Sequence, residues 1–282
     1  MNGLMLAGLY SLISAGVTLI FGVLHIINFA QGAFLMLGAY MLYYVINLFG
    51  FDFYTAFVLA VLIVGGLAIL TERYLYHRFW LHGAVLSCLV VSVGLTQVMQ
   101  NGALLVFGIY EKNVDSVFSG TINFFGLRYS LERFMLIVFA YLIIAGLMVF
   151  LNTSKRGQAM RAVAQDYDAA RLLGINPKRI AMLGMFIGVG LAAVAGAIIA
   201  PVYAVSAYMG EFMMIKAFLV IVIGGLGSVP GALIGALLIG MFESFGLTYF
   251  GHITNVYLFV FVIVVMLVRP TGLFGGTIFQ IR

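Results

Sequence analysis

Long apolar runs separated by short polar connections fill most of the chain. The runs lie at about 3 to 22, 28 to 48, 54 to 72, 84 to 107, 132 to 151, 179 to 204, 212 to 225, 230 to 249 and 253 to 268. Most of them approach the ~20 residues that a helix needs to cross a bilayer. A transmembrane β-barrel would instead show segments of about ten residues that alternate in polarity. The pattern predicts an all-α polytopic membrane protein with eight or nine transmembrane helices, and the short run at 212 to 225 is expected to be half of a broken or re-entrant helix.

Composition supports this class and adds a prediction about packing. The chain is 64% hydrophobic and 8% charged, whereas soluble domains carry about 25% charged residues. Its mean hydropathy is +1.18. The 34 glycines among 282 residues exceed the ordinary share of ~7%, and glycine lets membrane helices approach closely or break. We therefore expect residues 1 to 282 to form one tightly packed membrane domain, because the connections are too short to build a core of their own.

Lysine and arginine predict the orientation. Cytoplasmic loops of membrane proteins are enriched in these residues, and here they gather in the connections at 73 to 83 and 152 to 179 and in the C-terminal tail: Arg73, Arg78, Lys155, Arg156, Arg161, Arg171, Lys178, Arg179, Arg269 and Arg282. The connection at 108 to 131 has two basic and two acidic residues. With nine crossings, this places the N-terminus outside and the C-terminus in the cytoplasm. No basic residue precedes Arg73, so the first apolar run is expected to be a mature helix rather than a signal peptide.

The connection at 152 to 179 is the longest polar stretch. Within it, helical spacing from Gln158 to Leu173 gives an apolar stripe of Met160, Val163, Tyr167 and Ala170. This pattern predicts an amphipathic helix, which Gly174 ends and Pro177 keeps from continuing. The stretch is a simple topology signal, a helix on anionic lipid or a protein docking surface. Only a docking surface also accounts for the small residues grouped around Ala170, and it is the interpretation favoured here.

Several motifs together resemble a known family. Asp168-Ala169-Ala170, followed after three residues by Gly174, is similar to the EAA-type loop with which permeases of ATP-binding cassette (ABC) importers contact their ATPase subunits. Further similar segments are Gly16 to Val23, Ile27 to Tyr40, Gly224 to Ala232 and Arg269 to Gly275. In combination the chain resembles the LivH-type membrane subunits of branched-chain amino acid importers. It departs from the pattern at Asp168, where Glu is usual, in lacking a trailing Ile-x-Leu-Pro, and at Gln31, where His is common.

The resemblance implies a permease of the bacterial cytoplasmic (inner) membrane with several protein partners. These are two cytoplasmic ATPase subunits, a second homologous permease in a heterodimer or homodimer, and an external solute-binding protein. Its substrates would be Leu, Ile, Val or other small amino acids, although related permeases are associated with urea, short amides and aromatic acids. The ATPase-coupling residues would be Arg156, Gly157, Arg161, Ala162, Asp166, Asp168, Ala169, Ala170, Gly174 and Asn176. Beyond the lipid bilayer no other partner is expected, and none is a nucleic acid.

The chain itself has no nucleotide-binding motif. None of Lys112, Lys155, Lys178 and Lys216 fits Gly-x-x-x-x-Gly-Lys-Ser/Thr. The glycine-rich segment at 224 to 231 also lacks the preceding strand and following basic residue of a phosphate loop. We therefore expect no cofactor or metal on this chain, with ATP and Mg²⁺ on the partner ATPases.

A few polar and small residues at membrane depth are candidates for the translocation path or its gate: Asn28, Gln31, Gly32, Gly224, Gly225, Gly227, Ser228 and Glu243. Asn28 and Gln31 either line the path or bridge neighbouring helices by hydrogen bonds. The glycine-rich segment predicts a break between helices at the inner face, where transporters place gates. Glu243 is a charge inside a span and is by default functional. It either faces a cavity or sits protonated against a helix partner.

Two other charged residues are expected near a membrane surface. Glu211 and Lys216 are predicted to pair with each other or with partner chains.

Two other function classes compete with the importer permease. A secondary transporter or channel for a small polar solute would more often carry several charged residues inside its spans, whereas Glu243 is nearly alone. An intramembrane enzyme would need an activated nucleophile or a metal site. Cys88 lies in an apolar run, and the four histidines stand in no obvious catalytic arrangement. The sequence thus favours the permease and keeps the secondary transporter or channel as the alternative.

Overall fold

The computed structural model describes residues 1 to 80, 85 to 115, 120 to 124 and 127 to 274, so Gly275 and Arg282 lie outside the described part. In that part seven helices are long and apolar enough to cross a membrane: α1 (Asn2–Leu24), α2 (Gln31–Phe49), α3 (Phe53–Thr71) with its continuation, α5 (Val85–Phe107), α6 (Leu131–Thr153), α9 (Pro177–Ile199) and α11 (Val229–Phe250). Helix α3 continues into a π-helical turn, η1 (Glu72–Tyr76), and α4 (His77–Trp80). The prediction of an all-α polytopic membrane protein is confirmed.

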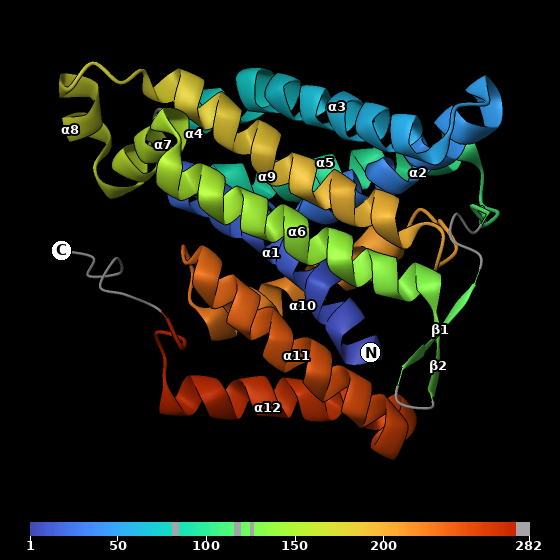
Figure 1. Cartoon of the computed structure of the whole chain (residues 1–282). Coiled ribbons are helices and arrows are strands. Elements are labelled where there is room, and N and C mark those ends of the chain that lie inside the picture. The colour runs from blue at the N-terminus through green and yellow to red at the C-terminus, as the bar shows by residue number, and fades with distance from the viewer. Residues whose placement is uncertain (81–84, 116–119, 125–126, 275–282) are drawn as a thin grey trace.

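The remaining elements are shorter. Helices α10 (Met209–Gly224) and α12 (Thr254–Val268) are apolar, α7 (Lys155–Gln165) and α8 (Tyr167–Leu172) are polar, and η2 (Gly251–Ile253) leads into α12. A small antiparallel hairpin of β1 (Thr121–Phe124) and β2 (Leu127–Ser130) pairs Thr121 with Ser130. Helices α7 and α8 lie at one end of the bundle, and the hairpin lies at the other end with the N-terminus (Figure 1).

Helix α1 is the centre of the bundle and is buried over nearly its whole length. It packs against α6, α9, α10 and α11. Small residues permit this close approach: a Cβ at Gly240 of α11 would stand 2.8 Å from the carbonyl oxygen of Gly3, and one at Gly188 of α9 would stand 2.8 Å from that of Gly16. The glycine content thus serves helix packing, as the sequence predicts.

Helix α10 begins inside the bundle. A Cβ at Gly32, near the start of α2, would stand 2.9 Å from the Cβ of Met214 and would overlap the Gly210 carbonyl. The adjacent Gln31 contacts Gly188, which is halfway along α9. The start of α10 therefore lies near mid-depth, which agrees with the broken helix expected at 212 to 225.

Candidate functional site

Helix α7 is fixed to the end of α6. The Ser154 hydroxyl accepts a hydrogen bond from the Gly157 N–H at 2.9 Å and so caps α7. A Cβ at Gly157 would stand 2.6 Å from the Cα of Leu151, so only glycine allows this contact. Arg161 donates from Nη1 to the Asn152 Oδ1 at 2.7 Å. A displacement of α7 must therefore move the C-terminal end of α6 as well.

The predicted amphipathic helix is interrupted at Asp166. This residue is extended, with φ −154, and its Oδ1 accepts the Ala169 N–H at 2.9 Å as the N-cap of α8. A single helix from Gln158 to Leu173 was therefore the wrong expectation, because an aspartate side chain that caps a new helix competes with helix continuation. The buried stripe nevertheless exists and includes Met160, Val163 and Ala170; Tyr167 packs partly buried against the same core.

After α8 the chain turns as predicted. Gly174 adopts φ 80, which favours glycine, and Ile175 N–H donates to the Ala170 carbonyl at 3.1 Å. Asn176 then caps α9 through a 3.3 Å hydrogen bond from the Arg179 N–H. A hollow of about 520 Å³ opens beside this turn, and Arg171 lines it.

The exposed tip of this segment is apolar, which the sequence analysis missed. Leu172 is 89% exposed and Leu173 is 80% exposed. Asp168 and Ala169 are exposed on the same short helix. The two leucines thus form a small exposed apolar patch on an otherwise polar segment. The sequence did contain a signal for this patch, because the two adjacent leucines lie outside the apolar stripe of an otherwise polar connection.

Asn28 and Gln31 are fully buried and join separate segments. The Tyr76 hydroxyl donates to Asn28 Oδ1 at 2.9 Å, and the same oxygen accepts the Ala30 N–H at 3.0 Å. Gln31 Nε2 donates to the Gly188 carbonyl of α9 at 2.6 Å. In this conformation both side chains bridge neighbouring segments, one of the two alternatives left open by the sequence.

The predicted glycine-rich break is the turn between α10 and α11. Gly225 and Gly227 have φ 98 and 86, and the Ser228 hydroxyl accepts the Gly231 N–H at 3.1 Å to cap α11. A Cβ at Gly224 would stand 2.9 Å from Ala232 N, so the two helix ends are in direct backbone contact.

The chain after α12 returns to this turn. Leu273 N–H donates to the Ile223 carbonyl at 2.8 Å and Phe274 N–H donates to the Gly224 carbonyl at 3.1 Å. The α10–α11 turn is thus held from outside by a second backbone segment.

A cavity of about 390 Å³ connects this turn with α7. Its lining includes Met160 and Arg161 of α7, Gly227 and Ser228 of the turn, and Phe274. The candidate coupling residues and the candidate gate residues therefore border one space, although 66 positions separate Arg161 from Gly227 in the sequence. Movement of α7 can change the space around the turn.

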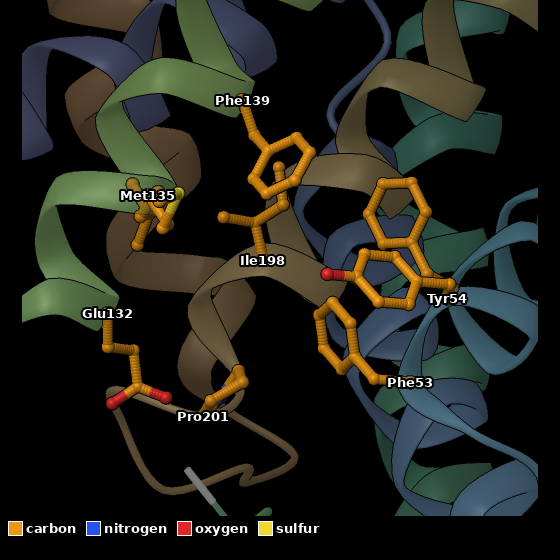
Figure 2. A pocket seen from close by; sticks show the side chains of 9 residues that line it. Phe53, Tyr54, Glu132, Met135, Phe139, Ile198 and Pro201 are labelled. Carbon is orange, nitrogen blue, oxygen red and sulfur yellow. The ribbon is translucent and has the colours of Figure 1, made fainter. Parts of the chain in front are cut away.

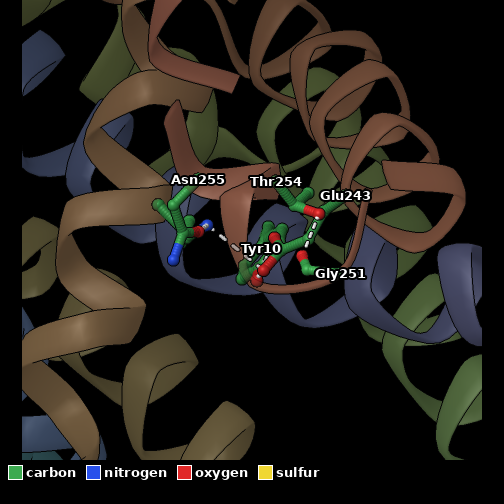
Figure 3. Close-up of polar contacts among 6 residues, drawn as sticks. Tyr10, Glu243, Gly251, Thr254 and Asn255 are labelled. Carbon is green, nitrogen blue, oxygen red and sulfur yellow. Dashed lines mark hydrogen bonds and ion pairs between the residues drawn. The ribbon is translucent and has the colours of Figure 1, made fainter. Parts of the chain in front are cut away.

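Glu243 lies in a network that also contains Lys216; Figure 3 labels its other members, Tyr10 and Asn255. Lys216 Nζ is 3.2 Å from Glu243 Oε1 and donates to Asn255 Oδ1 at 2.6 Å. The Tyr10 hydroxyl donates to Glu243 Oε2 at 2.8 Å. The expectation that Lys216 pairs with Glu211 was therefore wrong, because the α10–α11 hairpin brings Lys216 beside Glu243; pairing with a partner chain stays a prediction. Tyr10 and Asn255 were missed, and no local pattern in the sequence marks them.

A different pocket lies at the start of α3 and α6 and the end of α9. Figure 2 shows the rings of Phe53 and Tyr54 on one side and Glu132 near Pro201 on the other. The lining is almost wholly apolar, and Glu132 is its one charged residue. This pocket suits an apolar group and offers a zwitterion a partner for one of its charges only.

Metal binding has no assembled ligand set in the described residues. No three His, Cys, Asp or Glu side chains gather there closely enough to hold an ion.

Known proteins match the chain over nearly its full length. A family model described as branched-chain amino acid transport system / permease component matches residues 1 to 269. The high-affinity branched-chain amino acid transport system permease protein BraD of Pseudomonas aeruginosa is 35% identical over 289 residues, covering 97% of this chain and 94% of BraD. The corresponding permease protein LivH of Escherichia coli K12 is 34% identical with the same coverage. The permease protein LivM of E. coli K12 is 24% identical, covering 97% of this chain and 69% of LivM.

Proposed function

The chain belongs to the family of branched-chain amino acid transport permease components, and from this premise we propose how it works in an ATP-driven importer. It is a multi-pass membrane subunit, and its relatives support an amino acid permease and not the secondary transporter or channel. In our proposal, two cytoplasmic ATPase subunits bind ATP and Mg²⁺ and dock on the α7–α8 segment. The solute is a branched-chain or other small amino acid delivered by an external binding protein.

The single observation that carries the docking proposal is the exposed tip of α8. Leu172 and Leu173 are almost fully exposed beside the hollow at Gly174. The rest of the segment is anchored: Met160 and Val163 are buried, and Gly157 packs directly on Leu151. An exposed apolar tip on an anchored base suits a docking surface through which a movement of the partner is transmitted to the membrane helices.

The route inward follows the shared cavity. When the ATPase pair closes, α7 would shift against α6 and alter the cavity bordered by Arg161 and Ser228. The α10–α11 turn would respond, because its glycines at 225 and 227, which have positive φ, can change backbone conformation at little steric cost. Interfaces of this kind switch between discrete arrangements rather than deform continuously. We therefore assign the turn as the inner gate.

A second permease subunit completes the path. The similarity to both LivH and LivM supports pairing with a related chain, as a heterodimer or a homodimer. For the orientation, we propose that the α7–α8 end faces the cytoplasm of a bacterial inner membrane. The basic residues of the 152 to 179 connection lie there, as the positive-inside rule requires.

The proposal is tested on the complex purified with its ATPases and reconstituted in liposomes. Addition of a solute-loaded binding protein should stimulate ATP hydrolysis and leucine uptake. Replacing Leu172 and Leu173 by Ser should lower stimulated hydrolysis by at least about tenfold, since each buried leucine contributes roughly 1.5 to 3 kcal/mol to an interface and about 1.4 kcal/mol corresponds to a tenfold change. Gln165→Ser, an exposed change on α7, should leave it within about twofold.

Two results would overturn the docking role. One is normal stimulation in the double leucine variant, and the other is a complex in which no ATPase copurifies at all.

A further inference from the structure

The Lys216–Glu243 network lies at membrane depth. Glu243 is seven residues before the end of α11 at Phe250, about 10 Å at 1.5 Å per residue. Tyr10 is eight residues from the start of the buried α1. A charge at this depth costs about 2.5 kcal/mol or more unless it is paired or faces water, and here both an acid and a base are present.

The network also reaches the surface of the chain. The side chains of Lys216 and Glu243 each retain 13% exposure, and Asn255, which accepts from Lys216, is exposed on α12. A lipid-facing surface would leave these polar atoms in hydrocarbon, where bonding groups must be satisfied within the protein. The face around Asn255 therefore borders water or polar groups of another subunit within the complete importer.

Helix geometry places a break about two turns from this network. Helix α10 starts near mid-depth against Gly32, and the residues before it, from 200 to 208, form no regular helix. Lys216 follows two turns later on the same helix. Broken helices near the bilayer midplane are where transporters bind solutes.

We propose that Lys216 and Glu243 are a solute-binding pair of the translocation path that recognises the two charged groups of a zwitterionic amino acid. This inference rests on the proposed importer function and adds the residues that contact the solute. The solute carboxylate accepts from Lys216 Nζ, the solute ammonium donates to Glu243, and Tyr10 continues to hold the Glu243 carboxylate. Solute entry replaces the ion pair between Lys216 and Glu243 by two ion pairs, one between each residue and the solute. The site therefore carries no net charge before or after solute entry.

This replacement of ion pairs explains why a translocation path would carry both Lys216 and Glu243 rather than one of them. An unpaired Lys or Glu would bind one end of the zwitterion and strand its other charge, which is unfavourable in a low-dielectric site. A pair already in contact keeps the empty path neutral and releases the solute when it re-forms. Binding remains weak enough for passage, as conduction through a membrane site requires.

The decisive variant removes both charges. If the pair is only structural, Lys216→Met with Glu243→Gln should transport normally, because replacing both partners of a buried pair is often neutral. If the pair binds solute, leucine uptake should fall by about tenfold or more, the loss expected when charged hydrogen bonds to a ligand are removed. Stimulated ATP hydrolysis and thermal stability should stay near wild type. Glu211→Gln, on the first turn of α10, is the matched control and should leave uptake unchanged.

A second measurement tests water access while Lys216 and Glu243 both stay in place. Cys88 is the chain's one cysteine, so a Cys88→Ala background permits single-cysteine labelling. Asn255→Cys should react with a membrane-impermeant maleimide in the resting or the hydrolysing complex, whereas Val260→Cys, exposed on α12, should not.

The outcomes separate this inference from the proposed function. Stimulated hydrolysis with normal uptake in the double variant would overturn the solute-binding role alone, and so would a cysteine at 255 that never reacts. Loss of subunit assembly in the double variant would make the pair a subunit contact instead. Failure of the wild-type complex to respond to a loaded binding protein would overturn the importer itself.

Discussion

The α7–α8 segment and the Lys216–Glu243 network are assembled in opposite ways. The segment uses consecutive residues from Lys155 to Asn176, held by capping contacts over three residues. The network joins Tyr10 to Glu243 across 233 positions. A surface for a protein partner can be built locally because it needs exposure and a rigid base. A paired charge inside a membrane needs several helices to supply hydrogen bonds at once.

The first and largest expected effect comes from leaving one charge of the network without its ionic partner. Glu243→Leu leaves the Lys216 ammonium with Asn255 only, and the expected cost is about 3 to 5 kcal/mol of stability. Adding Lys216→Met should recover most of that loss. Thermal unfolding in detergent measures both changes against the wild-type protein. Equal melting of Glu243→Leu and wild type would mean that the pair is solvated and adds nothing to the fold.

How much the sequence revealed follows the same division. Hydrophobic run lengths predicted the helices, and local capping chemistry predicted the stop at Gly174 and the break at Gly225 and Gly227, because these depend on neighbouring residues. The partner of Lys216 was mistaken, since it depends on how α10 and α11 pack. The interruption at Asp166 was also missed. The apolar stripe continues before and after this residue, so the hydrophobic pattern does not show that its side chain caps a new helix.

The second prediction acts on the rigid base of the segment. Gly157→Leu places a side chain against the backbone of Leu151, and overpacking of this kind costs about 1 to 3 kcal/mol. Helix α7 should separate from α6, which would speed trypsin cleavage near Lys155 and lower stimulated ATP hydrolysis. Gly146→Leu on α6, where an added Cβ meets open space, should do neither. Unchanged proteolysis in Gly157→Leu would show that α7 is not held by this contact.

The smallest expected effect concerns the cap that separates α7 from α8. Asp166→Ala removes the acceptor for the Ala169 N–H and should destabilise α8 by about 1 kcal/mol, whereas Asp166→Asn keeps an acceptor and should change it by a few tenths. Hydrogen exchange of the α8 amides should therefore quicken in the first variant and hardly in the second, while α7 and the network stay protected. Because α8 has only six residues, it cannot be stable by propensity alone. If both variants exchange like wild type, the buried Ala170 and not the cap holds the helix, and the tip would then owe its position to tertiary packing, as the network does.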